Sequence, residues 1–247
     1  MTPPDVQLPA SKTRINKAGE VLRRTAEEKG PAGTEYRDSL DLVRAYRAVH
    51  AYPLKSVTMG LRHHARKAAG RSWLDISQRL KQLPTITDKL VRMPKTNLAR
   101  IQDIGGCRAT FLDQATVDTA ISSIENRAIR GSSWDIVDID DYVNERTRPD
   151  GYRAKHVIVR KHGVQIEMQF RTSAQHNWAE LVESLDKSLG LGLKQGRAEA
   201  WAVESVASAA EDMRRYEVGE IDRTRLVKAL NSSLRPILDL ADGVRIR

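Results

Sequence analysis

Hydrophobic and polar positions alternate most clearly in the stretch Val164–Arg171. Apolar residues at 164, 166, 168 and 170 alternate with Gln165, Glu167, Gln169 and Arg171. A period of two predicts a β-strand with one buried face and one polar face. The polar face would carry Glu167, Gln169 and Arg171 in a row, each about 6.5–7 Å from the next. Taken alone, such a row is best interpreted as a solvated strand face.

A turn signal just upstream, Asp150-Gly151, changes that interpretation. Tyr152 follows the turn at once, and His156 lies four residues further on. An Asp-Gly turn beside strand-forming segments predicts a hairpin. We therefore expect the tyrosine ring, the imidazole and the Glu167 carboxylate to meet on the face of one hairpin.

Helical spacing of apolar residues predicts three helices in the first part of the chain, near 12–29, 36–51 and 56–69, the last two separated by Pro53. A fourth helix is predicted from Ser72 to Leu83, with Ser72 as its N-cap. Pro84 would then end that element, and Thr85 or Thr87 would cap the next helix.

Strand and helix patterns follow one another in the rest of the chain. The predicted strands lie within 103–111, 136–143, 153–160 and 164–171, and the predicted helices at 113–130, 178–189, 198–215 and 224–240. Helices, then a small mixed sheet, then helices indicate an α+β fold with helical flanks. We divide the chain into an N-terminal helical extension (1–60), a core (61–190) and C-terminal helices (191–247) that pack on the core or mediate oligomerisation.

Charge is unevenly distributed along the 247 residues, which carry a formal net charge of +9. Residues 61–112 hold eleven Lys and Arg against three Asp and Glu, a net +8. Such a block favours a polyanion, which is a nucleoside triphosphate, RNA or both, and the alternative is a solvated, solubilising face. No apolar run approaches the ~20 residues of a membrane span, so we expect no membrane partner. The single cysteine, Cys107, excludes an internal disulfide framework and a cysteine-built zinc site and fits a cytoplasmic location.

Four cations gather around Pro84, in the stretch RLKQLPTITDKLVR. They are Arg79, Lys81, Lys89 and Arg92, and Asp88 alone is close in sequence to pair with them. This surplus suits a phosphate chain better than a salt-bridged surface. Neither the Walker phosphate-binding motif nor G-x-G-x-x-G occurs in the chain.

Four motifs in order resemble those of the synthetase domain of the RelA/SpoT family, over roughly Arg79–Glu183. The first is RLKQLPTITDKLVR, which is similar to the family's R-x-K…K-x-x-R motif. The second is DIGGCR, which is similar to D-x-x-G-x-R. The third and fourth are DYVNERTRPDGYRAKH and VQIEMQFRTSAQHNWAE, which are similar to the family's N-G-Y-x-S-x-H and V-E-I-Q-I-R-T-x-x-M-H-x-W-A-E stretches. One short match is weak, but four in order are specific to a fold.

The resemblance implies a nucleotidyltransferase-like mixed sheet and a transfer of the β,γ-pyrophosphate of ATP to the 3′-hydroxyl of GDP or GTP, with Mg²⁺ as cofactor. Residues matched to the family's ATP site are Arg79, Lys81, Lys89, Arg92 and Arg108. Asp103 and Glu167 are matched to its metal-binding carboxylates, with Glu167 also placed as general base. Residues matched to the acceptor side are Arg148, Tyr152, His156, Gln169 and His176.

Departures from the family's motifs leave the acceptor open. Arg148 stands where the family has Lys, Asp150 replaces an Asn, and Ala154-Lys155 replaces a Ser-Leu pair. Some small relatives are toxins that pyrophosphorylate the 3′ end of tRNA, and the basic block would suit that acceptor. A third interpretation is a catalytically degenerate nucleotide-binding regulator. The resemblance further implies a homo-oligomer built through terminal helices and, for a toxin, a partner antitoxin.

Overall fold

The computed structural model describes residues 6–28, 33–129, 131, 134–193 and 196–245. Its strands are β1 (Leu74–Leu80), β2 (Gly105–Phe111), β3 (Asp135–Asp141), β4 (Lys155–Lys161) and β5 (Val164–Thr172). Its helices are α1 (Lys12–Glu28), α2 (Thr34–Val49), α3 (Ala51–Ala69), α4 (Leu83–Arg92), the short 3₁₀ helix η1 (Leu98–Arg100), α5 (Gln114–Ile129), α6 (Ser173–Leu189), α7 (Ala200–Glu217), α8 (Arg223–Ser233) and α9 (Arg235–Arg245). The predicted α+β class is confirmed. Residues 29 and 130, the predicted ends of two helices, lie outside the described residues.

The five strands form one mixed sheet in the order β1-β2-β5-β4-β3. The β2–β5 pair is parallel, and the other three pairs are antiparallel. A two-residue turn, His162-Gly163, joins β4 to β5, and both residues have positive φ (49° and 78°), as a type I′ hairpin turn requires. This turn fixes the register in which His156 lies opposite Gln169.

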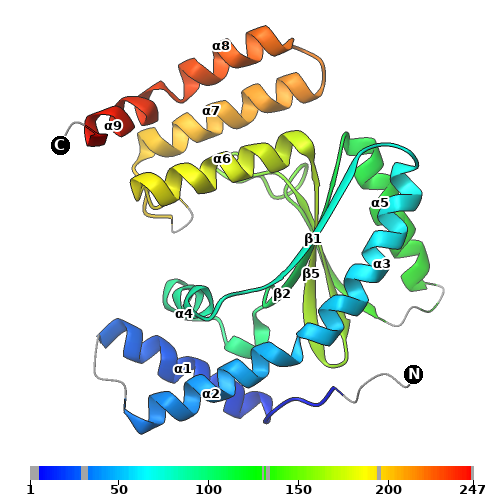
Figure 1. The fold of residues 1–247 in the computed structure, drawn as a ribbon, viewed down its shortest axis with the longest axis vertical. Coiled ribbons are helices and arrows are strands. Elements are labelled where there is room, and N and C mark those ends of the chain that lie inside the picture. The colour runs from blue at the N-terminus through cyan, green and yellow to red at the C-terminus, as the bar shows by residue number, and fades with distance from the viewer. Residues whose placement is uncertain (1–5, 29–32, 130, 132–133, 194–195, 246–247) are drawn as a thin grey trace.

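One face of the sheet is apolar and packs against α3 and α5, on the right in Figure 1. Its centre is built from fully buried side chains of neighbouring strands: Ala109, Phe111, Ile166, Met168, Phe170, Val157 and Val159. The opposite face carries the polar residues of the same strands, and α4 and α6 lie on that side (Figure 1). The alternation predicted for Val164–Arg171 is thus confirmed, except that Arg171 is only 7% exposed.

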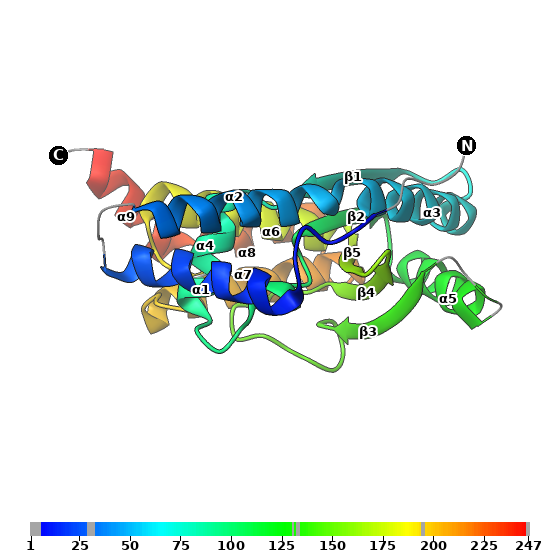
Figure 2. The same ribbon diagram turned by 90° about the horizontal axis from the view of Figure 1, so that it is seen from below.

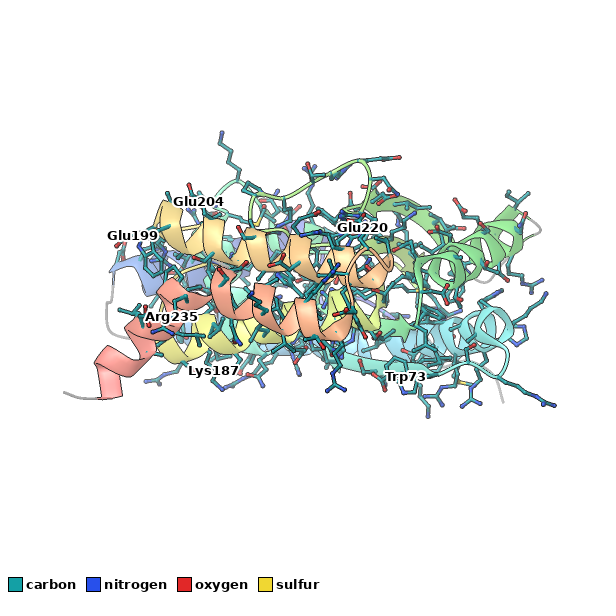
Figure 3. The ribbon with its side chains drawn as sticks, turned by 90° about the horizontal axis from the view of Figure 1, so that it is seen from above. Trp73, Lys187, Glu199, Glu204, Glu220 and Arg235 are labelled. Atoms are coloured by element: carbon teal, nitrogen blue, oxygen red, sulfur yellow. The ribbon has the colours of Figure 1, made fainter. Side chains whose placement is uncertain are left out.

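Helices at the two ends of the chain belong to two different hydrophobic clusters. Ile15 and Leu22 of α1 and Val43 of α2 join the core of the sheet. Figure 1 shows α1 and α2 at the lower end of the molecule, and Figure 2, seen from below, shows them side by side. Helices α6 to α9 form a second cluster around Trp178 and Val206. Figure 3 shows helices α6 to α9 from above. Glu199 and Arg235 lie at one end of this view, and Trp73, just before β1, lies at the other end. The predicted boundary at residue 60 falls inside α3, which is continuous from 51 to 69, and the threefold division remains a prediction.

The helix predicted from Ser72 to Leu83 is wrong, because Leu74–Leu80 is the edge strand β1. Leu74, Ile76 and Leu80 are the half-buried positions of the strand, and polar Gln78 interrupts their alternation. Because Gln78 interrupts the alternation, the sequence of this segment does not show the period of two that is typical of a strand. Pairing with β2 along all seven residues supplies the backbone partners that decide the structure.

Three element boundaries also differ from prediction. Pro53 lies in the first turn of α3 and Pro84 in the first turn of α4, where the missing N–H costs nothing, so neither proline separates two elements. Gln82, rather than Thr85 or Thr87, is the N-cap of α4. The helix predicted at 224–240 is two helices, α8 and α9, which meet at Leu234. Among the described helices, none is long and apolar enough to cross a membrane.

Candidate active site

The register of the sheet places predicted site residues from four strands in two rows on the polar face. One row runs from Arg79 through Gly106 to Glu167. The next row holds Ser77, Arg108, Gln169 and His156. Residues directly opposite one another on paired strands point to the same side of a sheet. Side chains predicted separately for ATP, metal and acceptor therefore share one surface.

Glu167 is held from both sides. The Nδ1 atom of His156 lies 3.1 Å from Oε1 of Glu167, and Nε2 of Gln169 donates to Oε2 at 2.6 Å. Burial would raise the pKa of Glu167, but its interactions with His156, the hydrogen bond foremost, outweigh burial, and the pKa is lowered overall. The carboxylate is therefore ionised at neutral pH and available as a ligand or base.

A hydrogen-bonded chain continues from His156 to Tyr152 and Arg171. The Tyr152 hydroxyl lies 2.8 Å from Nε2 of His156, and Arg171 donates to that hydroxyl at 2.6 Å. Because the hydroxyl accepts from Arg171, its own hydrogen can go to Nε2, which leaves the Nδ1 hydrogen for Glu167. The convergence of ring, imidazole and carboxylate predicted from the sequence is thus present, and Arg171 completes it.

Two guanidinium groups lie over the ring of Tyr152. The Cζ atoms of Arg148 and Arg171 are 5.3 and 5.0 Å from the ring centroid, within the range of cation–π contacts. The Arg148 side chain is 45% exposed, whereas Arg171 as a whole is 7% exposed. Tyr142 adds an edge-on aromatic contact to Tyr152 at 5.7 Å.

Asp150, one of the departures from the family motif, organises the loop that carries Tyr152. Its carboxylate accepts from Arg148 at 2.8 Å and from the Tyr152 backbone N–H at 3.2 Å. Lys155, the other added charge, pairs with Asp118 at 2.9 Å and Asp141 at 3.0 Å. Both added charges are thus neutralised within the chain.

Asp103 lies just before β2 and is held by two of the predicted ATP-binding lysines. Nζ of Lys81 is 2.7 Å and Nζ of Lys89 is 2.8 Å from its carboxylate oxygens. Burial opposes ionisation, but the two ammonium groups lower the pKa of Asp103 overall. Of the other two predicted cations near Pro84, Arg92 pairs with Asp88 at 3.0 Å on α4, and Arg79 lies on β1 opposite Gly106.

Asp103 and Glu167 are carboxylates that could hold a magnesium ion together with a phosphate chain. Their charges are close enough that Asp103 raises the pKa of Glu167. Gly106 has no side chain, so the space beside Glu167 stays open. A Cβ on residue 106 would fill it at 3.9 Å from Oε2 of Glu167. The described residues contain no group of three or more His, Cys, Asp or Glu side chains suited to a metal. A pair of carboxylates completed by substrate phosphates is a common way for proteins to hold Mg²⁺.

The end of the polar face nearest α6 is cationic. Arg108 lies 3.6 Å and His176 3.8 Å from the same oxygen of Glu180, whose side chain is 58% exposed. Burial and the neighbouring charge of Arg171 lower the pKa of Arg108. The Nε atoms of Arg108 and Arg171 are buried without a hydrogen-bond partner among the described residues. Such an excess of donors favours an anionic or π-rich ligand.

Two residues of this site have no role predicted from the sequence. Arg171 belongs to the predicted polar row, but the motifs assign it no function. The one feature of the sequence that points to Arg171 is its position at the end of the alternation. Gly106 falls within the strand predicted at 103–111, and nothing in the sequence gives it a role. Its place between Arg79 and Glu167 follows from the pairing of β2 with both β1 and β5.

Comparison with known proteins shows that the region of this site is similar to one protein family. Residues 78–186 match the model described as the region found in RelA / SpoT proteins. An uncharacterized Mycobacterium tuberculosis protein is 33% identical over 129 residues, which are 51% of this chain and 45% of that protein. The Bacillus subtilis GTP pyrophosphokinase YjbM is 29% identical over 124 residues, 45% of this chain and 55% of that protein. The chain therefore spans about half the length of the curated relatives it matches.

Solved structures share the fold. Small alarmone synthetase 2 from Bacillus subtilis has a TM-score of 0.57 at 20% identity, covering 70% of this chain and 93% of its own. Small alarmone synthetase 1 from the same organism, bound to its product pppGpp, has a TM-score of 0.54 at 22% identity, covering 68% and 89%. The motifs, the mixed sheet and the family match agree, and residues 78–186 of this chain are similar to the region found in RelA / SpoT proteins.

Proposed function

We propose that the protein is a pyrophosphokinase that transfers the β,γ-pyrophosphate of ATP to the 3′-hydroxyl of GDP or GTP and so makes (p)ppGpp. The observation that carries the proposal is the ionised Glu167, held by His156 and Gln169 beside the cationic group of Lys81 and Lys89. A base next to cations is what transfer of a highly charged phosphate group to a hydroxyl requires. The match to a GTP pyrophosphokinase supports the same reaction class.

In the proposed reaction the acceptor O3′ attacks the β-phosphorus of ATP. The new O3′–Pβ bond forms, the bond from Pβ to the bridging oxygen of the α-phosphate breaks, and AMP leaves. Glu167 takes the proton of the hydroxyl. Both ring nitrogens of His156 are engaged, with Tyr152 and Glu167, so we assign His156 to orienting Glu167. Asp103 and Glu167 would hold a magnesium ion, which would neutralise the phosphate charge when bound.

On the ATP side, Lys81 and Lys89 would exchange part of their contact with Asp103 for the phosphates. Arg79 and Arg108 would stack on the adenine, and Arg92 would bind the phosphate chain. Guanidinium groups suit stacking and bidentate phosphate contacts, and Arg108 carries an unpaired buried Nε for such a contact.

On the acceptor side, we assign base stacking to Tyr152. A base that stacks there would displace Arg148, the more exposed of the two guanidinium groups over the ring, and would leave Arg171 in place. Arg148, once released from Asp150, would be free to hold the acceptor phosphates. Gln169 and His176 would border the acceptor.

The tRNA acceptor gains no support from the position of the exposed cations on α3. Arg62, Arg66 and Lys67 are exposed on α3, which packs against the apolar face of the sheet, opposite to Glu167. An RNA bound along α3 would therefore lie on the other side of the sheet from the base. Asp103 and Glu167 are both ionised, which favours an enzyme over a degenerate regulator.

The test is to incubate the purified protein with γ-labelled ATP, Mg²⁺ and one acceptor at a time: GDP, GTP, an adenosine nucleotide or tRNA. We expect label on GDP and GTP. The double variant Arg66→Glu, Lys67→Glu should transfer to GDP at the wild-type rate, with little added salt dependence. Label on tRNA alone, lost in that double variant, would replace the proposal with the tRNA activity.

A further inference from the structure

A cavity of about 540 Å³ lies at the end of the sheet where β4 turns into β5. Segments far apart in the sequence form it: the start of α1, Tyr46 of α2, the stretch 97–102 around η1, and the hairpin residues 160–165. Its volume is in the range of pockets that bind small ligands. The cavity includes none of the residues assigned to ATP or the acceptor.

All charged side chains in the lining of this cavity are positive. Its lining includes Lys12, Arg100 and Arg160 but no Asp or Glu. The described part of the chain shows no ion pair for any of these three cations. Asp135 is the cross-strand neighbour of Arg160 without forming an ion pair to it, and nearby Asp103 is held by its two lysines. Three like charges therefore converge without compensation.

Neutral donors and a helix end complete the lining. The side chains of Asn97, Gln102 and Gln165 supply amide groups. Lys12 is the first residue of the 17-residue helix α1, so the positive end of the helix dipole lies at the cavity as well. Cations, amides and a helix N-terminus together are the features of a phosphate site, and the three cations carry the argument.

We propose that this cavity binds a polyphosphate group, either free pyrophosphate or the phosphates of a nucleoside diphosphate. Two guanidinium groups and an ammonium group match the charge of such a ligand, and guanidinium groups can contact phosphate oxygens in pairs. The cavity adjoins the candidate active site without being part of it. Gln102 directly precedes Asp103, and Gln165 lies two residues before Glu167 on the same face of β5.

The test measures binding in a chain whose candidate active site has been weakened on both sides, by Arg92→Ala among the residues assigned to the ATP phosphates and by Tyr152→Ala in the acceptor part. Inorganic pyrophosphate and GDP are titrated separately into this background protein by calorimetry at low salt. We expect one remaining site per chain for pyrophosphate. Adding Arg100→Ala and Arg160→Ala should weaken it at least ~10-fold, since hydrogen bonds to charged groups are the strong ones.

The matched control adds Arg71→Ala and Lys95→Ala to the same background, which removes as much charge from exposed positions outside the cavity. This control should bind pyrophosphate as the background does. Comparable affinity for GDP and pyrophosphate identifies the phosphates as the recognised group, and tighter GDP binding identifies a nucleotide. Absence of binding in the background, or equal loss in the control, would overturn the proposal.

Arg100 and Arg160 are exposed, so we expect their replacement to leave the fold intact. If the quadruple variant nevertheless unfolds, Lys12→Ala alone in the background provides the same comparison. No turnover is measured, so the outcome is independent of the proposed transfer reaction.

Discussion

The Nδ1 atom of His156 on β4 lies 3.1 Å from Oε1 of Glu167 on β5, and neither side chain is more than 13% exposed. The pair is diagonal across the two strands, because His156 is directly opposite Gln169 and Glu167 is directly opposite Ile158. Tyr152 and Arg171 extend this contact into a four-residue chain that ends on the strand where it began. Each side chain of this chain is oriented by its contact with the next one. The buried carboxylate of Glu167 is therefore held in one position.

We expect Glu167→Gln to keep the fold and to lower the transfer rate to GDP at least ~10²-fold, the contribution of a general base. The amide preserves shape and removes both the proton acceptor and the metal-binding charge. Initial rates at saturating ATP measure this loss. Glu204→Gln makes the same chemical change on the exposed surface of α7 and should leave the rate unchanged (Figure 3). A Glu167→Gln rate above about a tenth of wild type would remove Glu167 from this role.

Two substitutions separate the ring of Tyr152 from its hydroxyl. Tyr152→Ala should raise the acceptor KM about 10- to 100-fold, as loss of roughly 1–3 kcal/mol of stacking requires, with little change in the KM for ATP. Tyr152→Phe keeps the ring but breaks the link to His156 and Arg171, so it should lower kcat more than it alters KM. Equal weakening of ATP and acceptor by Tyr152→Ala would make Tyr152 a packing residue only.

The strand β5, which carries Glu167 and Gln169, could be predicted because its residues alternate without interruption. Val164–Thr172 has a buried residue at every second position up to Phe170, so periodicity alone places Glu167 and Gln169 on the polar face. In β1, Gln78 breaks the same pattern and leaves Arg79 in what looks like a helix. Propensity and period are local signals, and pairing with β2 overrode them.

The contacts between segments could not be predicted, because they depend on register. The His162-Gly163 turn sets which residue of β4 faces Glu167, and a shift of one residue would send His156 to the apolar face. The bond of Arg171 to Tyr152 depends in addition on the path of the 142–154 connection. The predicted gathering of four cations around Pro84 is correct for Lys81 and Lys89, which meet on Asp103.

A buried histidine outside the site predicts a pH dependence of stability. His50 has no exposed surface, and burial lowers its pKa from 6.5 to about 4, with Nδ1 bonded to the Tyr46 carbonyl. Between these pH values the unfolded chain binds a proton that the folded chain does not, so the free energy of unfolding falls as pH decreases. From pH 7 to 4 this contribution is roughly 3 kcal/mol, since one pKa unit is worth about 1.4 kcal/mol.

Urea unfolding at several pH values measures the effect of His50. His50→Phe removes the titrating group, so its free energy of unfolding should vary less than wild type between pH 6.5 and 4. His63→Phe changes an exposed histidine of α3 and should retain the wild-type slope. Identical slopes for His50→Phe and wild type would show that folding does not change the pKa of His50.

The loop that carries Tyr152 rests on α7 through Gly151. This glycine has φ of +73°, and a Cβ added to it would lie 2.4 Å from Cβ of Ala210. Gly151→Ala therefore meets two penalties, about 1–2 kcal/mol for the left-handed backbone and about 1–3 kcal/mol for the overlap. We expect a lower Tm together with a higher acceptor KM, because a loop pushed away from α7 moves Tyr152 relative to His156.

Two variants separate these penalties. Gly219 has nearly the same φ, +77°, with nothing within 4 Å of an added Cβ, so Gly219→Ala should show the backbone penalty alone and an unchanged KM. Combining Gly151→Ala with Ala210→Gly removes the overlapping atom, so it should restore much of the acceptor affinity that Gly151→Ala loses. The rescue distinguishes contact with α7 from backbone strain, because the strain at residue 151 is the same in both proteins. If Gly151→Ala behaves like Gly219→Ala in Tm and KM, α7 has no part in positioning the acceptor loop.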